Sequence, residues 1–285
     1  MPGEDELWAR VRARLPGLSG GHRQVAEYVL KNSEKAAFMT AAALSQVVGV
    51  SESTVVRFAT ALGYSGYPEL QRALQEVIKQ RLTTVDRLWG SAAAGEQGIL
   101  YNVMNTDMEN IRLTLRDLDE AAFERAVDAI LAARQIAVVG VRSGASLAWF
   151  LGFNLSWVLN NVRVVGSGPL DMWEQLATLE PADLVIAISF PRYSRPTVRA
   201  LDVARKRGAK TIAITDTIMS PLAQRADITL TARGNIASFV DSFVAPLSLA
   251  NALLTAVSVR DKDRTARALA ELEEIWEREG IYYQE

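Results

Sequence analysis

The 285-residue chain contains no cysteine and only one histidine, His22. The absence of cysteine excludes disulfides, thiolate zinc sites, iron–sulfur clusters and cysteine nucleophiles. A single histidine leaves little basis for a metal site built from imidazoles or for a Ser-His-Asp triad. We therefore expect no bound metal and no cofactor, and we assign no catalytic residue.

Long hydrophobic runs are also lacking. The start of the chain is charged and contains no apolar core of the kind that defines a signal peptide. The longest apolar region, residues 236–259, is interrupted by Asp241, Pro246 and Asn251, which favours a packed helix over a membrane span. We expect a cytoplasmic protein with no membrane partner.

The composition is that of a folded globular protein, with 49% hydrophobic and 22% charged residues. The length predicts two domains. Residues 1–81 carry ten Lys and Arg against eight Asp and Glu, whereas the remainder carries 21 against 25. This mild asymmetry permits a nucleic-acid-binding N-terminal part without indicating one by itself.

The periodicity of apolar residues changes along the chain. Residues 1–81 hold short helical patterns separated by turn signals, which predicts an all-α domain. Residues 82–118 are expected to form a linker and a connector helix, with Gly90–Gly95 as a flexible stretch. From 119 to 285, short Val- and Ile-rich runs alternate with helical patterns, which predicts a parallel sheet covered by helices on both faces. The expected strands are residues 136–141, 162–165, 184–189, 211–215 and 228–230.

Residues 40–63 show the pattern of a helix-turn-helix. Leu44 and Val47 are expected on the inner side of its first helix. Gly49 permits a tight turn with positive φ, and Ser51 can cap the second helix. The inner side of that second helix is expected to consist of Val55, Phe58 and Leu62.

The first turns of this second helix carry the candidate DNA contacts. Short hydroxyl side chains and one guanidinium suit close approach to phosphates and to base edges in the major groove of double-stranded DNA. The candidates are Ser51, Glu52, Ser53, Thr54 and Arg57. The alternative is that the alanine-rich helix and its glycine turn belong to a small helical bundle without a DNA partner.

Several segments resemble the RpiR family of bacterial transcription regulators. The most specific are VSESTVVRF and LGYSGYPEL, which stand at the family's spacing; AVVGVRSG, DLVIAISF and ARKRGAKTIAIT match as well. The resemblance implies a multidomain fold, with an all-α helix-turn-helix domain followed by an α/β, Rossmann-like parallel sheet of the sugar isomerase (SIS) type. It also implies a ligand-responsive regulator of sugar or related catabolic genes.

Three loops follow predicted strands on the side where open parallel sheets bind ligands, beyond the carboxyl ends of the strands. They are residues 140–146, 189–194 and 215–217, and we expect a helix to begin near Ser220 after the third. The first loop lacks the G-x-G-x-x-G fingerprint, so no NAD is expected.

SIS domains bind phosphosugars through hydroxyls of the first two loops, and here the resemblance is partial. Arg142 replaces the second glycine of the usual G-x-G-x-S, and Gly144 takes the place of its serine. Pro191 and Arg192 occupy the middle of the usual S-x-S-G-x-T/S. Because an Arg fork pairs with phosphate or carboxylate, we expect an anionic effector, either a phosphosugar or a carboxylate. The candidate contacts are Arg142, Ser143, Ser146, Ser189, Arg192, Tyr193, Ser194 and Thr215.

Other interpretations stay open at this point. The arginines can instead pair with local carboxylates or with a partner subunit. The alternative function is a sugar-phosphate isomerase with an accessory helical domain, which would need a base and a ring-opening acid. The sheet half contains no histidine, and Glu174 and Glu180 are the acids that could approach its loops. A third class is a scaffold whose sheet domain only dimerises.

We favour a regulator over an enzyme. We expect a homodimer or homotetramer that holds paired helix-turn-helix modules on a palindromic operator. The aromatic side chains on one predicted helix serve either the core or a subunit interface; they are Trp149, Phe150, Phe153 and Trp157. Whether the effector releases or recruits the protein stays open.

Overall fold

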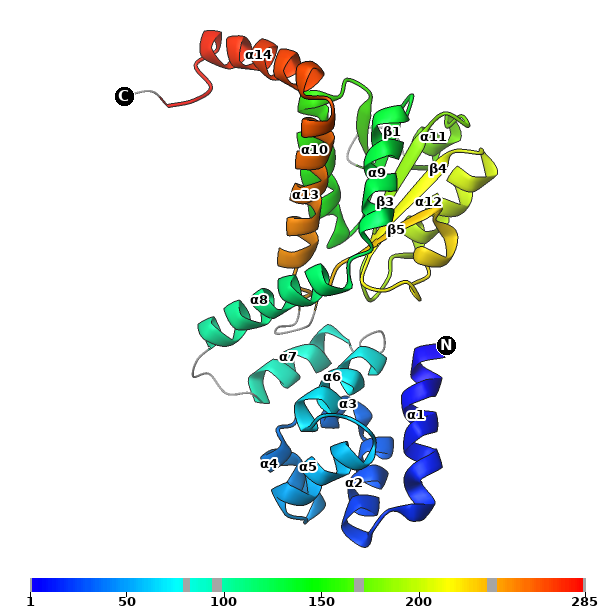
Figure 1. The fold of residues 1–285 in the computed structure, drawn as a ribbon, viewed down its shortest axis with the longest axis vertical. Helices are drawn as coiled ribbons and strands as arrows, with labels where there is room; N and C mark the ends of the chain where they lie inside the picture. The colour runs from blue at the N-terminus through cyan, green and yellow to red at the C-terminus, as the bar shows by residue number, and fades with distance from the viewer. Residues whose placement is uncertain (1, 79–82, 94–98, 167–171, 235–239, 284–285) are drawn as a thin grey trace. The chain divides into compact units, whose positions relative to one another are not determined.

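The computed structural model describes residues 2–78, 83–93, 99–166, 172–234 and 240–283 (Figure 1). By its internal contacts the chain divides into two compact units. The first comprises residues 1–106 together with 236–242, and the second comprises 107–235 together with 243–285.

The described residues of the first unit form helices joined by turns and loops and contain no strand, as the sequence predicts. Its elements are α1 (Pro2–Arg14), the 3₁₀ turn η1 (Leu15–Gly17), α2 (Gly20–Lys31), α3 (Ser33–Ala36), α4 (Ala41–Val48), α5 (Glu52–Ala61), α6 (Tyr67–Ile78) and α7 (Thr84–Ala93). Helices α1 to α6 enclose one apolar core, in which Phe58, Leu44 and Leu70 are among the largest fully buried side chains. Burial raises the pKa of the Tyr67 phenol, whose hydroxyl donates a 2.8 Å hydrogen bond to the Met39 carbonyl.

The prediction of a flexible stretch at Gly90–Gly95 is wrong for its first four residues, because α7 continues through Ala93. Residues 94–98 lie outside the described residues. The start of α7 is fixed by a reciprocal cap. The Thr83 amide donates to Asp86 Oδ2 at 2.8 Å, and the Asp86 amide donates to Thr83 Oγ1 at 3.1 Å. Within the first unit, Arg87 of α7 also forms a nearly buried ion pair with Asp241 at 3.0 Å.

The second unit contains a parallel sheet of five strands within the described residues, in the order β2-β1-β3-β4-β5. All five strands lie where the sequence predicts them, with ends shifted by no more than two residues. They are β1 (Ile136–Val139), β2 (Val162–Val165), β3 (Leu184–Ile188), β4 (Lys210–Thr215) and β5 (Ile228–Thr231). The helices of this unit are α9 (Glu120–Ala132), α10 (Gly144–Val158), α11 (Met172–Ala177), α12 (Arg195–Lys206), α13 (Val244–Arg260) and α14 (Lys262–Arg278). A further helix, α8 (Ile99–Asp117), joins the sequence of the two units.

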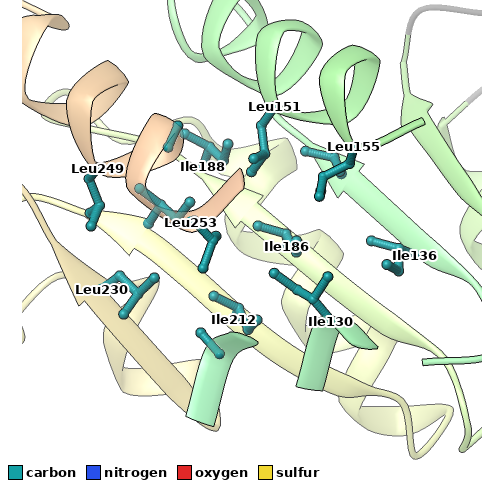
Figure 2. Packing of buried hydrophobic residues seen from close by; sticks show 14 of the residues in the cluster. Ile130, Ile136, Leu151, Leu155, Ile186, Ile188, Ile212, Leu230, Leu249 and Leu253 are labelled. Carbon is teal, nitrogen blue, oxygen red and sulfur yellow. The ribbon is translucent and has the colours of Figure 1, made fainter. Parts of the chain in front are cut away.

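Both faces of the sheet are covered. Ile136, Ile186 and Ile212 point to one face, where they pack with residues of α9, α10 and α13 such as Ile130, Leu151 and Leu253 (Figure 2). Alternate residues of the same strands point to the other face, against α11 and α12. Burial on both faces explains why the strands are continuously apolar and therefore recognisable in the sequence.

The helix expected near Ser220 is absent from the described residues there, and that prediction is wrong. A single 3₁₀ turn, η2 (Ala223–Arg225), occupies the connection instead. The Ser220 hydroxyl accepts from the Ala223 amide at 3.0 Å, and the bond between Asp227 and Thr211 of β4 at 2.8 Å directs the chain into β5 directly after this turn. Among the helices that the structure describes, none combines the length and the hydropathy that a membrane span requires.

Candidate functional site

The first candidate site is the helix-turn-helix of α4 and α5. Helix α4 ends at Gly49, which adopts the left-handed conformation with φ 78°. Ser51 caps α5, because its Oγ accepts a hydrogen bond from the Thr54 amide at 3.2 Å. The turn and the cap are therefore where the sequence predicts them.

The apolar side of this motif is confirmed with one correction. Leu44, Phe58 and the other residues predicted on the inner side of α5 are buried. The prediction that Val47 lies in the core is wrong, since its side chain is 55% exposed. Val48 is partly buried against the core in its place, because the buried side of α4 passes through Leu44 and Ser45 and therefore reaches the i+4 position and not the i+3 position.

The solvent face of α5 carries the predicted DNA contacts. Ser53 and Arg57 are exposed and joined, with Arg57 Nη2 donating to Ser53 Oγ at 3.1 Å. Ser51 and Glu52 are exposed at the start of the helix, whereas Thr54 is half-buried. A Cβ on Gly21 of α2 would lie 3.1 Å from the Thr54 methyl, so Thr54 is partly used in packing.

Sequence reasoning missed two residues on this face. Val56 and Thr60 are exposed and stand three and seven positions after Ser53. Helical spacing from Ser53 would have found both. An exposed Val on such a helix has the chemistry to contact a thymine methyl group.

The second candidate site lies beyond the carboxyl ends of β1, β3 and β4. The register pairs Val139 with Ala187 and Ile188 with Ile214, so the loops after these strands emerge side by side. The first loop packs directly on the end of β3, because a Cβ on Gly144 would lie 2.8 Å from the Ile188 carbonyl oxygen. A serine at position 144 would therefore clash with backbone, which accounts for the glycine found there.

Arg142 is exposed and has φ 56°, the left-handed conformation that favours glycine. The resemblance places a glycine at this position, and the backbone keeps the glycine-like conformation while the side chain is an arginine. Among the described residues, Arg142 forms no ion pair. Ser143 and Ser146 are exposed beside it, with Ser146 Oγ donating to the Ser143 carbonyl at 2.8 Å.

The second loop supplies Ser189, Arg192, Tyr193 and Ser194. Ser189 Oγ accepts from the Ser194 amide at 3.0 Å, and Ser194 caps α12 by accepting from the Thr197 amide at 3.4 Å. Both serines are buried, so these oxygens already hold the loop in place. Arg192 is exposed.

The third loop is joined to the second through an aspartate that sequence reasoning did not select. The Tyr193 hydroxyl donates to Asp216 Oδ1 at 2.7 Å, and the Thr215 hydroxyl reaches the same oxygen at 3.2 Å. Thr215 is fully buried. Its hydroxyl therefore orients Asp216, and the position of Asp216 directly after β4 was the signal available in the sequence.

A cavity of about 220 Å³ opens over the ends of β4 and β5. Asp216 is part of it, but none of the eight predicted effector contacts lines it. Its walls are Thr114, Asp117, Asp216, Thr217, Ile218, Thr231, Ala232 and Arg233. Arg233 pairs with Asp117 at 2.7 Å, and hydrogen bonds from Arg116 and Arg233 lower the pKa of Asp117 to about 2. No group of His, Asp and Glu residues suited to a metal ion occurs within the described ranges.

Comparison with known proteins defines the class of both units. Residues 6–81 match the helix-turn-helix domain of the rpiR family, and residues 129–256 match the SIS domain. Among curated relatives, the HTH-type transcriptional regulator HexR of Pseudomonas aeruginosa is 29% identical over 259 residues, covering 89% of this chain and 90% of HexR. The chain thus has the architecture of transcriptional regulators that join a DNA-reading helix-turn-helix to a SIS domain.

Two solved structures extend the comparison. The sugar isomerase domain of an RpiR transcription factor from Sphaerobacter thermophilus is 36% identical, with a TM-score of 0.59; the match covers 62% of this chain and 99% of that domain. The NanR protein of Vibrio vulnificus, solved in complex with ManNAc-6P, is 22% identical with a TM-score of 0.56, over 95% of this chain and 97% of NanR. The chain belongs to the RpiR family of transcriptional regulators.

Proposed function

We propose that this protein binds a palindromic operator through α5 and that a small anionic metabolite at its SIS domain modulates that binding. One observation carries the proposal: the chain joins a capped helix with an exposed polar face to a sugar-isomerase sheet whose ligand edge has hydroxyls and arginines but no histidine. The division of labour follows the sequence, with residues 1–81 as reader, 82–118 as connector and 119–285 as sensor and oligomerisation domain.

The positions of two acids argue against an isomerase. Glu180 pairs with Arg134 at 3.3 Å and precedes β3, so it stands at the amino edge of the sheet, opposite the ligand edge. Glu174 is exposed on α11, as an ordinary surface acid is. Neither is positioned as a base for moving a proton on a bound sugar, and the curated relatives are named regulators.

The operator-binding part of the proposal rests on the exposed face of α5. Ser53 and Arg57 are held together there, as a hydroxyl and a guanidinium suited to phosphate and base contacts. A binding sequence is first selected from a random duplex library. Fluorescence anisotropy with that duplex then measures how much Arg57 contributes to operator affinity. Arg57→Ala should weaken operator binding by about 1–3 kcal/mol. Arg12→Ala, an exposed arginine on α1, is the matched control and should leave the affinity within about twofold of wild type; equal effects would contradict this choice of recognition helix.

The effector part rests on Arg142. Its guanidinium is exposed on the loop that packs on β3, and it forms no ion pair with any residue that the structure describes. A phosphosugar is the first class to test, since the fold is shared with a NanR solved with ManNAc-6P, and a sugar carboxylate is the second. Calorimetry with ManNAc-6P, a hexose 6-phosphate and gluconate would rank the two classes. Retained affinity in both Arg142→Ala and Arg192→Ala would refute the roles given to these arginines.

A further inference from the structure

The end of α14 borders a cavity that neither proposed site uses. Its volume is about 440 Å³, and its walls are Glu273, Glu274, Trp276, Glu277, Gly280 and Tyr282. All six residues belong to the last turns of α14 and to the short segment that follows this helix, drawn in red in Figure 1. The cavity therefore lies within the second unit and is built from one short stretch of chain.

The backbone after α14 shapes this cavity. Gly280 adopts φ 61°, and its amide donates to the Glu277 carbonyl at 3.2 Å. The Ile281 amide donates to the Trp276 carbonyl at 2.9 Å. These two bonds and the left-handed glycine make a Schellman motif, which ends the helix and reverses the chain. The reversal returns Tyr282 to Trp276, six positions earlier in the sequence.

The two returned rings form a right-angled corner. The ring centroids of Trp276 and Tyr282 are 5.4 Å apart and their planes are inclined by 89°. Trp276 also contacts Trp157 of α10, at 5.2 Å between centroids. Trp276 is half-buried and Tyr282 is 55% exposed, so the corner is fixed by packing but accessible to a ligand. The face of each ring carries negative potential, and two such faces at a right angle attract a cation that lies between them.

The acidic side chains of the cavity favour a cation as well. Glu273, Glu274 and Glu277 are exposed, and they form no ion pair with any residue that the structure describes. Arg278, the basic residue of the last helical turn, is directed to Glu279, because its Nε donates to Glu279 Oε1 at 2.9 Å. Aromatic faces and negative charge thus act on the same space.

The ring faces indicate an organic cation and not a metal ion. A divalent metal ion needs several oxygen ligands that converge on it, and no group of His, Asp and Glu is placed to hold one in the part of the chain that the structure describes. A quaternary ammonium has no N–H to donate, and proteins recognise it through aromatic faces. We propose that this cavity binds a small organic cation whose quaternary ammonium head lies between Trp276 and Tyr282.

Choline and 3,3-dimethyl-1-butanol test the role of charge, because the two compounds have the same shape and only choline is a cation. Titration calorimetry of the full chain at constant ionic strength should show saturable binding of choline at millimolar concentrations. The neutral alcohol should bind at least about fivefold more weakly. Equal binding of the two compounds, or no saturable binding of choline, would overturn the proposal.

Variants of Tyr282 test the aromatic corner. Tyr282→Leu keeps apolar bulk but removes the ring, so it should weaken choline binding about two- to fivefold. Tyr282→Phe keeps the ring face and should bind choline within about twofold of wild type. The side chain is exposed, so neither change should prevent folding. Wild-type affinity in Tyr282→Leu would contradict a ligand held at this corner.

A matched pair of acids tests the negative charge. Glu277→Gln should weaken choline binding by up to about fivefold. Glu271→Gln is the control, because Glu271 is exposed on the same helix and does not line the cavity, so its affinity should stay unchanged. Equal losses in the two variants would show general attraction to an acidic helix and would contradict a built site. These titrations contain neither DNA nor effector, so their failure leaves the proposed function to its own assays.

Discussion

Replacing Arg142 by glycine separates two properties that the structure gives this residue. The left-handed backbone at φ 56° costs a non-glycine residue about 1–2 kcal/mol. Glycine removes this cost, but it raises the conformational entropy of the unfolded chain, which lowers the stability of the fold by about 0.4–1 kcal/mol. The balance is a stabilisation between about 0 and 1.6 kcal/mol, which for a unit of this size raises Tm by up to about 6 °C. At the same time the guanidinium is lost, and with it charged hydrogen bonds of about 1.5–3 kcal/mol, or about 10- to 150-fold in effector affinity.

Differential scanning calorimetry and titration calorimetry with the best ligand of the panel measure the two effects. Arg142→Ala is the control, because it removes the guanidinium while the backbone stays strained, so it should lose affinity without gaining stability. If Arg142→Gly melts no higher than Arg142→Ala, the account of backbone strain is wrong. If both variants bind as wild type does, the account of effector binding is wrong, and the two conclusions are reached separately.

Three further changes test other parts of the structure. Ser51→Ala removes the cap of α5 and should cost about 1 kcal/mol of stability in chemical unfolding of the first unit. Gly152→Ala would set a Cβ 2.4 Å from Val164 Cγ2, so a urea titration should show a loss of about 1–3 kcal/mol; an unchanged midpoint would mean that α10 shifts freely over β2. Asp117→Asn should lower stability at neutral pH. The pKa of Asp117 is about 2 in the folded protein, below its ordinary 3.8, so the ionised carboxylate stabilises the fold above pH 3.8 and this effect is lost as the pH falls. The stabilities of wild type and variant should therefore converge as the pH drops from about 4 toward 2.

The sequence predicts the sheet well because its strands are buried on both faces. A strand such as Leu184–Ile188 is a short, continuous apolar run rich in Val and Ile, with the polar residues Asp183 and Ser189 on either side. The cap at Ser51 and the turn at Gly49 are local as well, since each needs only a few neighbouring residues. Features fixed by short-range chemistry can therefore be predicted from the residues themselves.

Features that depend on a choice between equivalent residues are less predictable. Val47 and Val48 have the same chemistry, and only packing of the first unit decides which one is buried. Gly90 has a low helix propensity, but the reciprocal cap between Thr83 and Asp86 starts α7 firmly enough to carry the helix past it. In both cases a neighbouring contact outweighs the preference of the single residue.

Hydroxyl groups show the same limit at the ligand edge. Ser194 and Thr215 are chemically suited to a phosphate, yet the fold uses one to cap α12 and the other to hold Asp216. A serine or threonine after a strand serves either purpose with the same atoms, so residue type alone does not separate them. Burial does, and it directs attention to the exposed Arg142, Ser143 and Arg192.

The first loop shows why its departures from the family pattern belong together. Position 144 admits no side chain, because the Ile188 carbonyl lies 2.8 Å from where a Cβ would be, so the serine of the usual motif cannot stand there. Position 142 has open surroundings but a left-handed backbone, so an arginine fits there at a cost of about 1–2 kcal/mol. Strain of this kind persists where the surrounding structure or the function maintains it. The loop has thus lost a neutral hydroxyl and gained a strained cation at the same edge, which is the exchange expected if the effector is held by charge.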